Sequence, residues 1–374
     1  MRFSNQVSAT CDVATPSRKL QPEVSQRRDL FYTELREMKP DRFDSWLKVD
    51  SKGLFCRPGE FHIDPYGGAK RAIVTHGHSD HARPGHDHVL ATAETIAVMK
   101  TRLGTAAKSG TQTAVYGEKL KIGEVSVTLL PAGHVLGSAQ ILIEWKGARA
   151  VVSGDYKRSA DPTCLPFELV PCDLFITEAT FALPVFQHGD ATAEVSKLIK
   201  SHQWFPERAH VVGVYGLGKC QRVIALLRAQ GYDRPIYLHG ALAECCALYE
   251  SFGVRLGELK PATGAPRDEL KGQIVLAPPS AIVDRWSRRL PDPVAAFASG
   301  WMRVRARARQ QGVELPLVIS DHADWRELTE TIAETGAEEV WVTHGREDAL
   351  LHHIQMTGRK GRALALIGRE DEDQ

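Results

Sequence analysis

The pattern of apolar and polar residues divides the chain into stretches of two kinds. In the first, between about residues 46 and 177, short apolar runs typical of strands are separated by loops, with little helix between them. The strand candidates are short strands within Trp46–Asp64, followed by Ala72–Thr75, Val125–Leu130, Gln140–Trp145, Arg149–Ser153 and Leu174–Thr177. This arrangement is typical of a mixed α/β sandwich with layers in the order αββα.

From about residue 183, helical and strand patterns alternate. The predicted helices are Ala191–Ser201, Lys219–Gln230 and Leu242–Phe252, and the strands between them are Val211–Val214, Ile236–His239 and Ile274–Ala277. Such alternation predicts a parallel α/β unit. Further strands are expected at Leu317–Ser320, Val340–Thr343 and Leu364–Ile367, whereas residues 1–42 are polar and are expected to form a loose extension with one short helix over Leu30–Met38.

Length and charge limit the possibilities only partly. A chain of 374 residues is long enough for two domains. Its 47 basic and 46 acidic residues give a net charge of +1, so bulk charge provides no attraction to a polyanion. A nucleic-acid partner would therefore have to be attracted by local basic patches and by bound metal.

Cysteine usage and hydropathy predict a cytoplasmic protein that does not contact membranes. The seven cysteines are odd in number and contain no CxxC pair, which favours free thiols in a reducing compartment. No apolar run approaches about 18 residues, and the N-terminus lacks the apolar core of a secretory signal.

The strongest chemical signal is the segment Thr75-His76-Gly77-His78-Ser79-Asp80-His81, directly after an apolar strand. Side chains two residues apart in an extended segment point the same way, so His76 and His78 can share one metal ion. Asp80 and His81 follow after a turn and can face a second ion. Imidazole suits zinc, and a mixed set with carboxylates also admits manganese or iron.

The spacing HxHxDH after a strand resembles the metal motif of the metallo-β-lactamase superfamily. Three further motifs of that superfamily have matches in the expected order. They are Asp64 in Phe61-His62-Ile63-Asp64, His134 in Pro131-Ala132-Gly133-His134 and Asp155 in Ser153-Gly154-Asp155-Tyr156. Each of these residues taken alone is more often a structural group, but their joint occurrence in order favours the resemblance.

The resemblance implies two divalent metal ions, with zinc expected first and manganese as the alternative. One ion would be held by His76, His78 and His134, the other by Asp80 and His81, and Asp155 would bridge the two. Asp64 and Asp80 would also belong to the catalytic residues. Two such ions activate a water molecule at neutral pH, and their positive charge suits a phosphodiester.

About 130 residues of α/β character, at 183–315, intervene between the part of the chain with Asp155 and the last candidate motifs. This layout resembles the β-CASP branch of the superfamily, whose members process nucleic acids. The motifs of this branch match Glu178 in Thr177-Glu178-Ala179, His322 in Ser320-Asp321-His322 and His344 in Val342-Thr343-His344. The resemblance implies that His344 completes the second metal site. It further implies that His322 is the general acid for the leaving alkoxide and that Glu178 orients it.

The predicted architecture is therefore an αββα metallo-β-lactamase sandwich, residues 43–182 and 316–374, with a β-CASP domain inserted at 183–315. The expected function is that of a metal-dependent nuclease on single-stranded DNA, most similar to bacterial DNA-ligase-associated exonucleases in DNA repair. A DNA ligase and a helicase are possible partners by resemblance. An RNA-processing nuclease of the same branch, favoured by His344, and a catalytically inactive scaffold are the alternatives.

Phosphate-handling residues are expected in the inserted domain. Gly216-Leu217-Gly218-Lys219 lies between a strand and a helix, where backbone N–H groups and Lys219 can receive a phosphate, although a plain turn is an equal alternative. Arginines at 303, 305, 307 and 309 would share one face if extended, and would scatter over the surface if helical. The resemblance adds Ser299 and Gly300 as binders of a terminal phosphate, alongside Arg303 and Arg305.

Other conspicuous residues are interpreted as structural or solvated. His86 and His188 are expected in solvent-exposed loops. Cys245-Cys246 lies in an apolar helical stretch and is expected in the core.

Overall fold

A computed structural model of the chain describes residues 42–104, 110–345 and 347–364. The predicted N-terminal extension, except for Arg42, and its helix over Leu30–Met38 lie outside the described residues. So do residues 365–367 of the last predicted strand. In the described part, no helix has the length and apolar character that crossing a bilayer requires.

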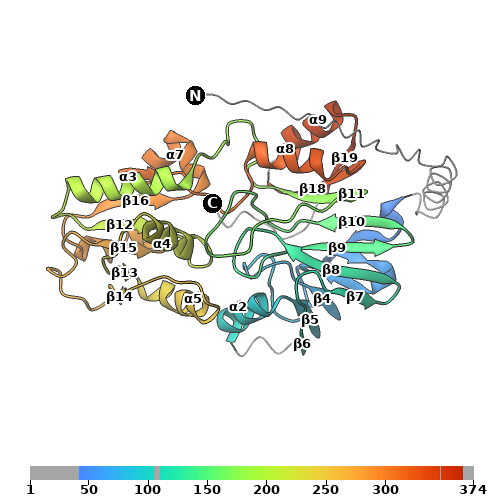
Figure 1. The fold of residues 1–374 in the computed structure, drawn as a ribbon, viewed down its shortest axis with the longest axis horizontal. Coiled ribbons are helices and arrows are strands. Elements are labelled where there is room, and N and C mark those ends of the chain that lie inside the picture. The colour runs from blue at the N-terminus through green and yellow to red at the C-terminus, as the bar shows by residue number, and fades with distance from the viewer. Residues whose placement is uncertain (1–41, 105–109, 346, 365–374) are drawn as a thin grey trace, which may run out of the picture. The chain divides into compact units, whose positions relative to one another are not determined.

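Two sheets face each other in the first layered unit (Figure 1). The strands of the first sheet, in spatial order, are β1 (Leu47–Asp50), β2 (Gly53–Cys56), β3 (Phe61–Ile63), β4 (Arg71–Ile73), β5 (His88–Ala91) and β6 (Gly110–Thr113). Those of the second are β19 (Lys360–Ala363), β18 (Glu339–Gly345), β11 (Leu174–Ala179), β10 (Ala148–Val152), β9 (Ala139–Trp145), β8 (Val125–Pro131) and β7 (Lys119–Ile122).

The inner strands β8 to β11 of the second sheet are buried on both faces, which explains why they are apolar without alternation. In β9, Ile141 and Ile143 pack into the core between the sheets, whereas Leu142 points the other way, into the core under the helices. Neighbouring side chains of a strand point to opposite faces, so both faces need apolar residues when both are covered.

Helices cover the outer faces of both sheets. On the first sheet lies α2 (Ala93–Leu103), with Ile96 and Met99 in the contact. On the second lie α8 (Trp325–Glu334) and α9 (Glu347–Met356), and Figure 1 shows both helices beside β18 and β11. The order helix, sheet, sheet, helix confirms the predicted αββα sandwich.

A third sheet, entirely parallel, is built from residues 210–317. Its spatial order is β14 (Leu259–Pro261), β13 (Ile236–Leu238), β15 (Ile274–Ala277), β12 (His210–Gly213), β16 (Val294–Ala298) and β17 (Leu315–Leu317). Its helices are α3 (Ala191–Trp204), α4 (Lys219–Ala229), α5 (Gly240–Ser251), α6 (Pro279–Ile282) and α7 (Arg305–Gln310). The parallel α/β character agrees with the sequence, whereas the domain limits 43–182, 183–315 and 316–374 stay a prediction.

The core of the third sheet extends to the edge of the sandwich. Val98 of α2 and Leu136, in the loop after β8, belong to the same buried cluster as Tyr249 of α5. The Tyr249 hydroxyl lies 3.2 Å from the backbone nitrogen of Leu136, which donates a hydrogen bond to it. Because Leu136 is two residues from His134, this contact ties the third sheet to a loop with a predicted metal ligand.

Candidate metal centre

The segment after β4 brings its histidines together as expected. His76 is fully buried, and its Nε2 atom lies 3.1 Å from Nδ1 of His78. A Cβ added to Gly77 would collide with the Val98 side chain, so this position between the two histidines has no room for a larger residue.

His134 joins these two histidines from the loop after β8. Its Nε2 atom lies 3.0 Å from His78 Nδ1. The ring nitrogens of His76, His78 and His134 and a carboxylate oxygen of Asp155 all lie within 4.8 Å of one another. Three imidazoles and a carboxylate are a donor set that zinc accepts.

A second group of donors lies beside the first. One ligand atom each of Asp80, His81 and His344 lies within 4.8 Å of the others. The rings of His81 and His344 are stacked with centroids 5.0 Å apart, although His81 lies in the loop after β4 of the first sheet and His344 in β18 of the second. The structure thus brings together all seven residues that the resemblance assigned to metal binding.

Asp155 lies between the two groups. One of its carboxylate oxygens, Oδ2, is 3.4 Å from Nε2 of His76 and 3.4 Å from Nε2 of His81. A single oxygen equidistant from one histidine of each group is in the position that a bridging ligand needs.

The donor set fits divalent cations by its protonation as well. Burial lowers the pKa of His76 to about 4 and holds the pKa of His134 well below its usual value. The pKa of Asp155 also lies well below its usual value, because His81 and His76 outweigh the opposing effect of burial. Neutral imidazoles and an ionised carboxylate are the forms that bind metal.

His81 supplies a further test of the fit. Its Nε2 atom is buried and makes no hydrogen bond, yet it faces the carboxylates of Asp80, at 3.2 Å, and Asp155. Burial opposes a charge on this ring, but Asp80, Asp155 and Asp64 together raise its pKa well above its usual value. A buried ring nitrogen surrounded by carboxylates is a natural place for a cation.

Asp64 contacts His81 at Nδ1, the ring nitrogen that does not face Asp80 and Asp155. Its Oδ2 lies 2.7 Å from Nδ1 of His81 and accepts a hydrogen bond of 2.6 Å from the Thr75 hydroxyl. A carboxylate on the far nitrogen of a ligand histidine fixes the ring's tautomer and orientation. The structure therefore places Asp64 outside both ligand groups.

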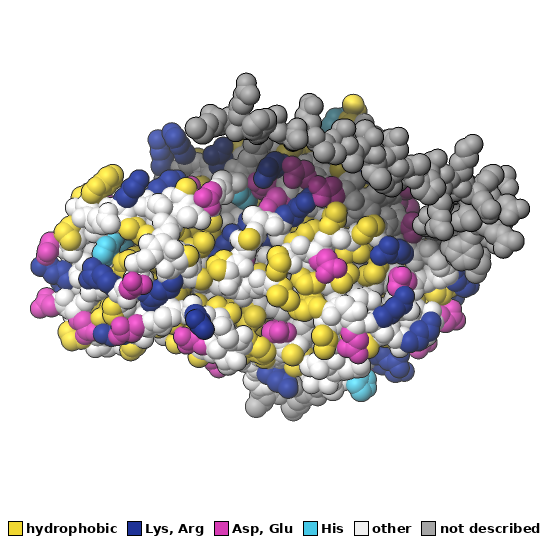
Figure 2. All heavy atoms as spheres, viewed as in Figure 1, with side chains coloured by type: hydrophobic (Ala, Val, Ile, Leu, Met, Phe, Trp, Pro, Cys, Tyr) yellow, Lys and Arg dark blue, Asp and Glu magenta, His cyan; other side chains and the backbone are white. Residues whose placement is uncertain are grey.

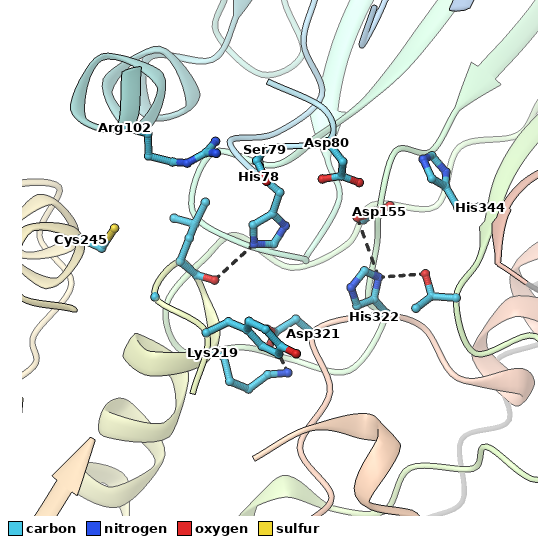
Figure 3. Close-up of a pocket in the computed structure, with 14 residues that line it drawn as sticks. His78, Ser79, Asp80, Arg102, Asp155, Lys219, Cys245, Asp321, His322 and His344 are labelled. Carbon is cyan, nitrogen blue, oxygen red and sulfur yellow. Dashed lines mark hydrogen bonds and ion pairs between the residues drawn. The ribbon is translucent and has the colours of Figure 1, made fainter. Parts of the chain in front are cut away.

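His322 and Glu178 form a pair at the same centre. Nδ1 of His322 lies 3.0 Å from Oε2 of the fully buried Glu178, whose Oε1 accepts a hydrogen bond from the backbone of Tyr156. Burial raises the pKa of Glu178. Figure 3 shows His322 pointing into the same cavity as Asp80, Asp155 and His344. Asp155, Glu178 and His322 also lie close enough together to form a third candidate ligand group.

The cavity at this centre has a volume of about 270 Å³. It is lined from the sandwich and from the third sheet (Figure 3) by His78, Ser79, Asp80, Arg102, Asp155, Thr180, Tyr215, Gly216, Leu217, Lys219, Cys245, Asp321, His322 and His344. Sequence reasoning missed Arg102 and Tyr215. Their signal is weak, because Arg102 is a single residue near the end of a helix and Tyr215 a single residue in a loop.

Lys219 lies at this cavity but is not a free point charge. It is 2% exposed, donates a hydrogen bond to the carbonyl of Ile319 and forms an ion pair of 3.0 Å with Asp321. The carbonyl of Asp321 in turn lies 2.9 Å from Nδ1 of His134. Asp321 therefore contacts both Lys219, whose charge its carboxylate balances, and His134, a predicted metal ligand.

The remaining predicted phosphate binders lie away from the cavity lining. Ser299 is buried and caps the short helix Gly300–Arg303 by accepting a hydrogen bond from Trp301. The extended alternative for the arginine run is wrong, because Arg303 belongs to the short helix Gly300–Arg303 and the other three arginines to the helix Arg305–Gln310, which scatters these side chains. One of them, Arg307, packs over the ring of Trp301 at 3.9 Å.

Two histidines that were interpreted as exposed are not. His86 is 3% exposed and accepts a hydrogen bond from the backbone of Ala69. His188 is partly buried, and both of its ring nitrogens are inaccessible to solvent. No pattern in the sequence indicates that either residue is buried, because both lie in polar loops.

Comparison with known proteins adds relatives on both the DNA and the RNA side. The chain is 30% identical over 309 residues to a probable DNA ligase of Opitutus terrae, a match that covers 80% of this chain and 29% of the relative. It is 29% identical over 148 residues to cleavage and polyadenylation specificity factor subunit 3 of Dictyostelium discoideum, with 37% and 19% covered. It is 27% identical over 224 residues to the endoribonuclease YSH1 of Gibberella zeae, with 48% and 27% covered.

The chain thus spans less than a third of the length of each of these relatives. A crystal structure of a protein of unknown function from Enterococcus faecalis has a similar fold, with a TM-score of 0.55, 14% identity and 80% of each chain covered. No family model matches the chain.

The facing sheets, the helices outside them and the two groups of histidines and acids at one edge define a metallo-β-lactamase fold. Within this fold, a parallel third sheet and the pair Glu178 and His322 at the centre are the features of the β-CASP branch that the sequence motifs predicted. The chain belongs to the β-CASP branch of the metallo-β-lactamase superfamily.

Proposed function

We propose that the chain is a metal-dependent nuclease that hydrolyses phosphodiester bonds of single-stranded DNA. The observation that supports it most directly is the position of Asp155, with one oxygen 3.4 Å from a histidine of each ligand group. His76, His78 and His134 would hold one divalent cation and Asp80, His81 and His344 the other. Two such cations supply an activated water and positive charge against the phosphodiester.

The chain's own residues would then handle the protons and the orientation of the substrate. His322 donates a proton to the leaving alkoxide, and Glu178 holds the ring by its Nδ1 atom at 3.0 Å, so that Nε2 is the atom directed at the substrate. Arg102, at the opposite wall of the cavity, supplies a positive side chain near the entering strand.

Local chemistry, rather than bulk charge, would bind the nucleic acid. On the face in Figure 2, Lys and Arg are interspersed with Asp and Glu and form no continuous basic surface. This distribution agrees with a net charge of +1. We therefore infer that affinity comes mainly from the metal centre and the cations at its rim, with modest dependence on salt.

The preference for DNA rests on the relative that matches the greater part of the chain, the probable DNA ligase of Opitutus terrae. A role in DNA repair beside a DNA ligase follows as part of the proposal, with zinc in both sites and manganese as the alternative. An RNA nuclease is the second candidate, because the endoribonuclease YSH1 matches 48% of the chain. An inactive scaffold is disfavoured, since all the predicted ligands are present and brought together.

Matched oligonucleotides test this proposal. Single-stranded DNA and RNA of one sequence, labelled at the 5′ or the 3′ end, would be incubated with the protein and zinc or manganese. We expect DNA to be hydrolysed faster than RNA, with a ladder of products that starts at one end. Faster hydrolysis of RNA would show that RNA, and not DNA, is the preferred substrate. If neither strand is hydrolysed with zinc or with manganese, the proposed nuclease function is contradicted.

A further inference from the structure

A second cavity, of about 100 Å³, lies on the other side of the segment that carries His322. It is lined by Lys157, Ser159, Ala160, His188, Gly189, Asp190, Ala191, Thr192, Arg222, Leu226, Val318 and Ser320. Ser320 belongs to this cavity, whereas the next two residues, Asp321 and His322, line the metal cavity. The two cavities are therefore separated by one stretch of backbone and share no lining residue.

Lys157 is the most unusual side chain in this cavity. It is only 3% exposed, yet within the described part of the chain its ammonium group has no hydrogen bond and no ion pair within 4.0 Å. An ammonium group that faces a narrow cavity and keeps little of its hydration is stabilised by a counter-anion. An anion in the cavity would provide the missing partner.

Arg222 brings a second cation to the same wall. It is 2% exposed, and its guanidinium is held by Asp161 at 3.4 Å, by Asp321 at 3.6 Å and by the carbonyl of Ser320. These contacts involve Nε and Nη1. They fix the plane of the group and leave Nη2 without an acceptor among the described residues. A guanidinium held in one plane is preorganised to donate to an oxyanion.

Further donors come from the beginning of α3 and the loop before it. The first N–H groups of a helix have no acceptor within the helix, and the structure supplies none for those of Gly189, Asp190 and Ala191. His188 adds an imidazole whose two nitrogens are buried without a hydrogen-bond partner. Because neither nitrogen is accessible from the cavity, the ring contributes to its wall but not to its donors.

The charges at the cavity favour an anion. Its lining holds two cations, Lys157 and Arg222, and one carboxylate, Asp190. The Asp190 side chain is exposed and is engaged as the cap of α3, where it accepts a hydrogen bond of 2.8 Å from the backbone of Thr192. The acids that pair with Arg222 lie behind it and do not line the cavity. A cation would face two positive side chains and N–H groups, and would gain only Asp190.

We propose that this cavity binds a phosphate-type anion, separately from the metal centre. Lys157, Arg222 and the N–H groups of Gly189, Asp190 and Ala191 surround it with donors, which is the arrangement that oxyanions select at helix N-termini. The volume of about 100 Å³ accommodates a phosphate group. The proposal does not depend on nuclease activity, since binding of inorganic phosphate can be measured whether or not the chain hydrolyses nucleic acid.

Calorimetric titration of the full chain with inorganic phosphate tests this site. Lys157→Met keeps the length of the side chain and removes the charge, and we expect it to weaken phosphate binding by at least about tenfold, the loss of one charge-assisted hydrogen bond. Arg158→Met is the matched control, because Arg158 lies next in the chain but pairs with Glu334 outside the cavity. Phosphate bound only at the metal centre would remain in both variants, and equal affinity of the Lys157→Met and wild-type proteins would overturn the proposal.

A second pair of variants covers the case in which Lys157→Met does not fold. Thr192 lines the cavity and is exposed at its mouth, whereas the next residue, Ala193, is exposed outside it. Glutamate is well accepted in the first turn of a helix, so both Thr192→Glu and Ala193→Glu should fold. We expect only Thr192→Glu to reduce phosphate affinity by repulsion, and an equal effect of the two would refute the site.

The source of the phosphate is distinguished with oligonucleotides that carry a phosphate on the 5′ end, on the 3′ end or on neither. If the anion is a phosphorylated strand end, Thr192→Glu lowers affinity for one of the phosphorylated strands and spares the unphosphorylated strand. If the anion is free phosphate, the variant binds all three strands like the wild type but loses inorganic phosphate. Unchanged binding of phosphate and of all three strands would contradict both.

Discussion

Replacement of Asp80 by asparagine is expected to reduce hydrolysis of single-stranded DNA by more than about a hundredfold. The loss of a group that merely supports a ligand costs 10–100-fold, and a ligand should cost more. Asp80 lies 3.2 Å from Nε2 of His81 and lines the metal cavity. The amide has nearly the same size, so the fold should persist, but it lacks the negative charge that would hold a cation in the second group.

The control for this experiment is Asp87→Asn. Asp87 belongs to the same loop region between β4 and β5, is exposed, and lies outside both ligand groups. Initial rates, thermal unfolding and bound metal would be measured for both variants. Asp87→Asn should match the wild type in all three, whereas Asp80→Asn should unfold at the same temperature with less metal. Full activity of Asp80→Asn would remove the two-metal account.

Replacement of His322 by alanine should reduce turnover by roughly 10²–10⁴-fold, the usual contribution of a general acid. In the proposed mechanism His322 supplies the proton for the leaving alkoxide, and the buried carboxylate of Glu178 holds it at 3.0 Å. Without the imidazole, the alkoxide would leave unprotonated or take a proton from water. Bound metal should be unchanged, because His322 belongs to neither of the two ligand groups around His76 and His81.

Measurement of bound metal distinguishes a general-acid role of His322 from a role as a metal ligand. Asp155, Glu178 and His322 also lie close enough together to hold an ion. If His322 were a ligand, the alanine variant would lose metal in proportion to activity. The general-acid role further predicts that a substrate with a better leaving group, such as a nitrophenyl ester of a nucleotide, restores much of the lost rate. A variant with wild-type turnover would take the role away from His322.

The parts of the centre that could be predicted from the sequence are those whose spacing is local. His76, His78, Asp80 and His81 lie within six residues after a strand, and strand geometry alone places the first two side by side. By contrast, Asp155 lies in the loop after β10 and His344 near the end of β18, both in the second sheet and far along the chain. Only the resemblance to a known family could connect them with the first group.

What the sequence could not reveal depends on tertiary contacts. Lys219 had the features of a phosphate-binding residue, yet the fold places Asp321 within 3.0 Å and neutralises it. The alternating arginines after Met302 fit a strand, but Arg305–Gln310 forms a helix and Arg307 stacks on Trp301. In both cases the contacts of the side chain depend on a partner elsewhere in the chain, Asp321 for Lys219 and Trp301 for Arg307. A local sequence pattern does not identify such a partner.

The central claim is that two cations are gathered at one edge of the sandwich, with Asp155 between them. The most direct measurement is the number of zinc ions bound per chain after chelator treatment and titration, for the wild type and for Asp155→Ala. The account predicts two ions for the wild type and weakened binding at both positions in the variant. Two ions held as tightly by Asp155→Ala as by the wild type, or fewer than one by the wild type, would contradict it.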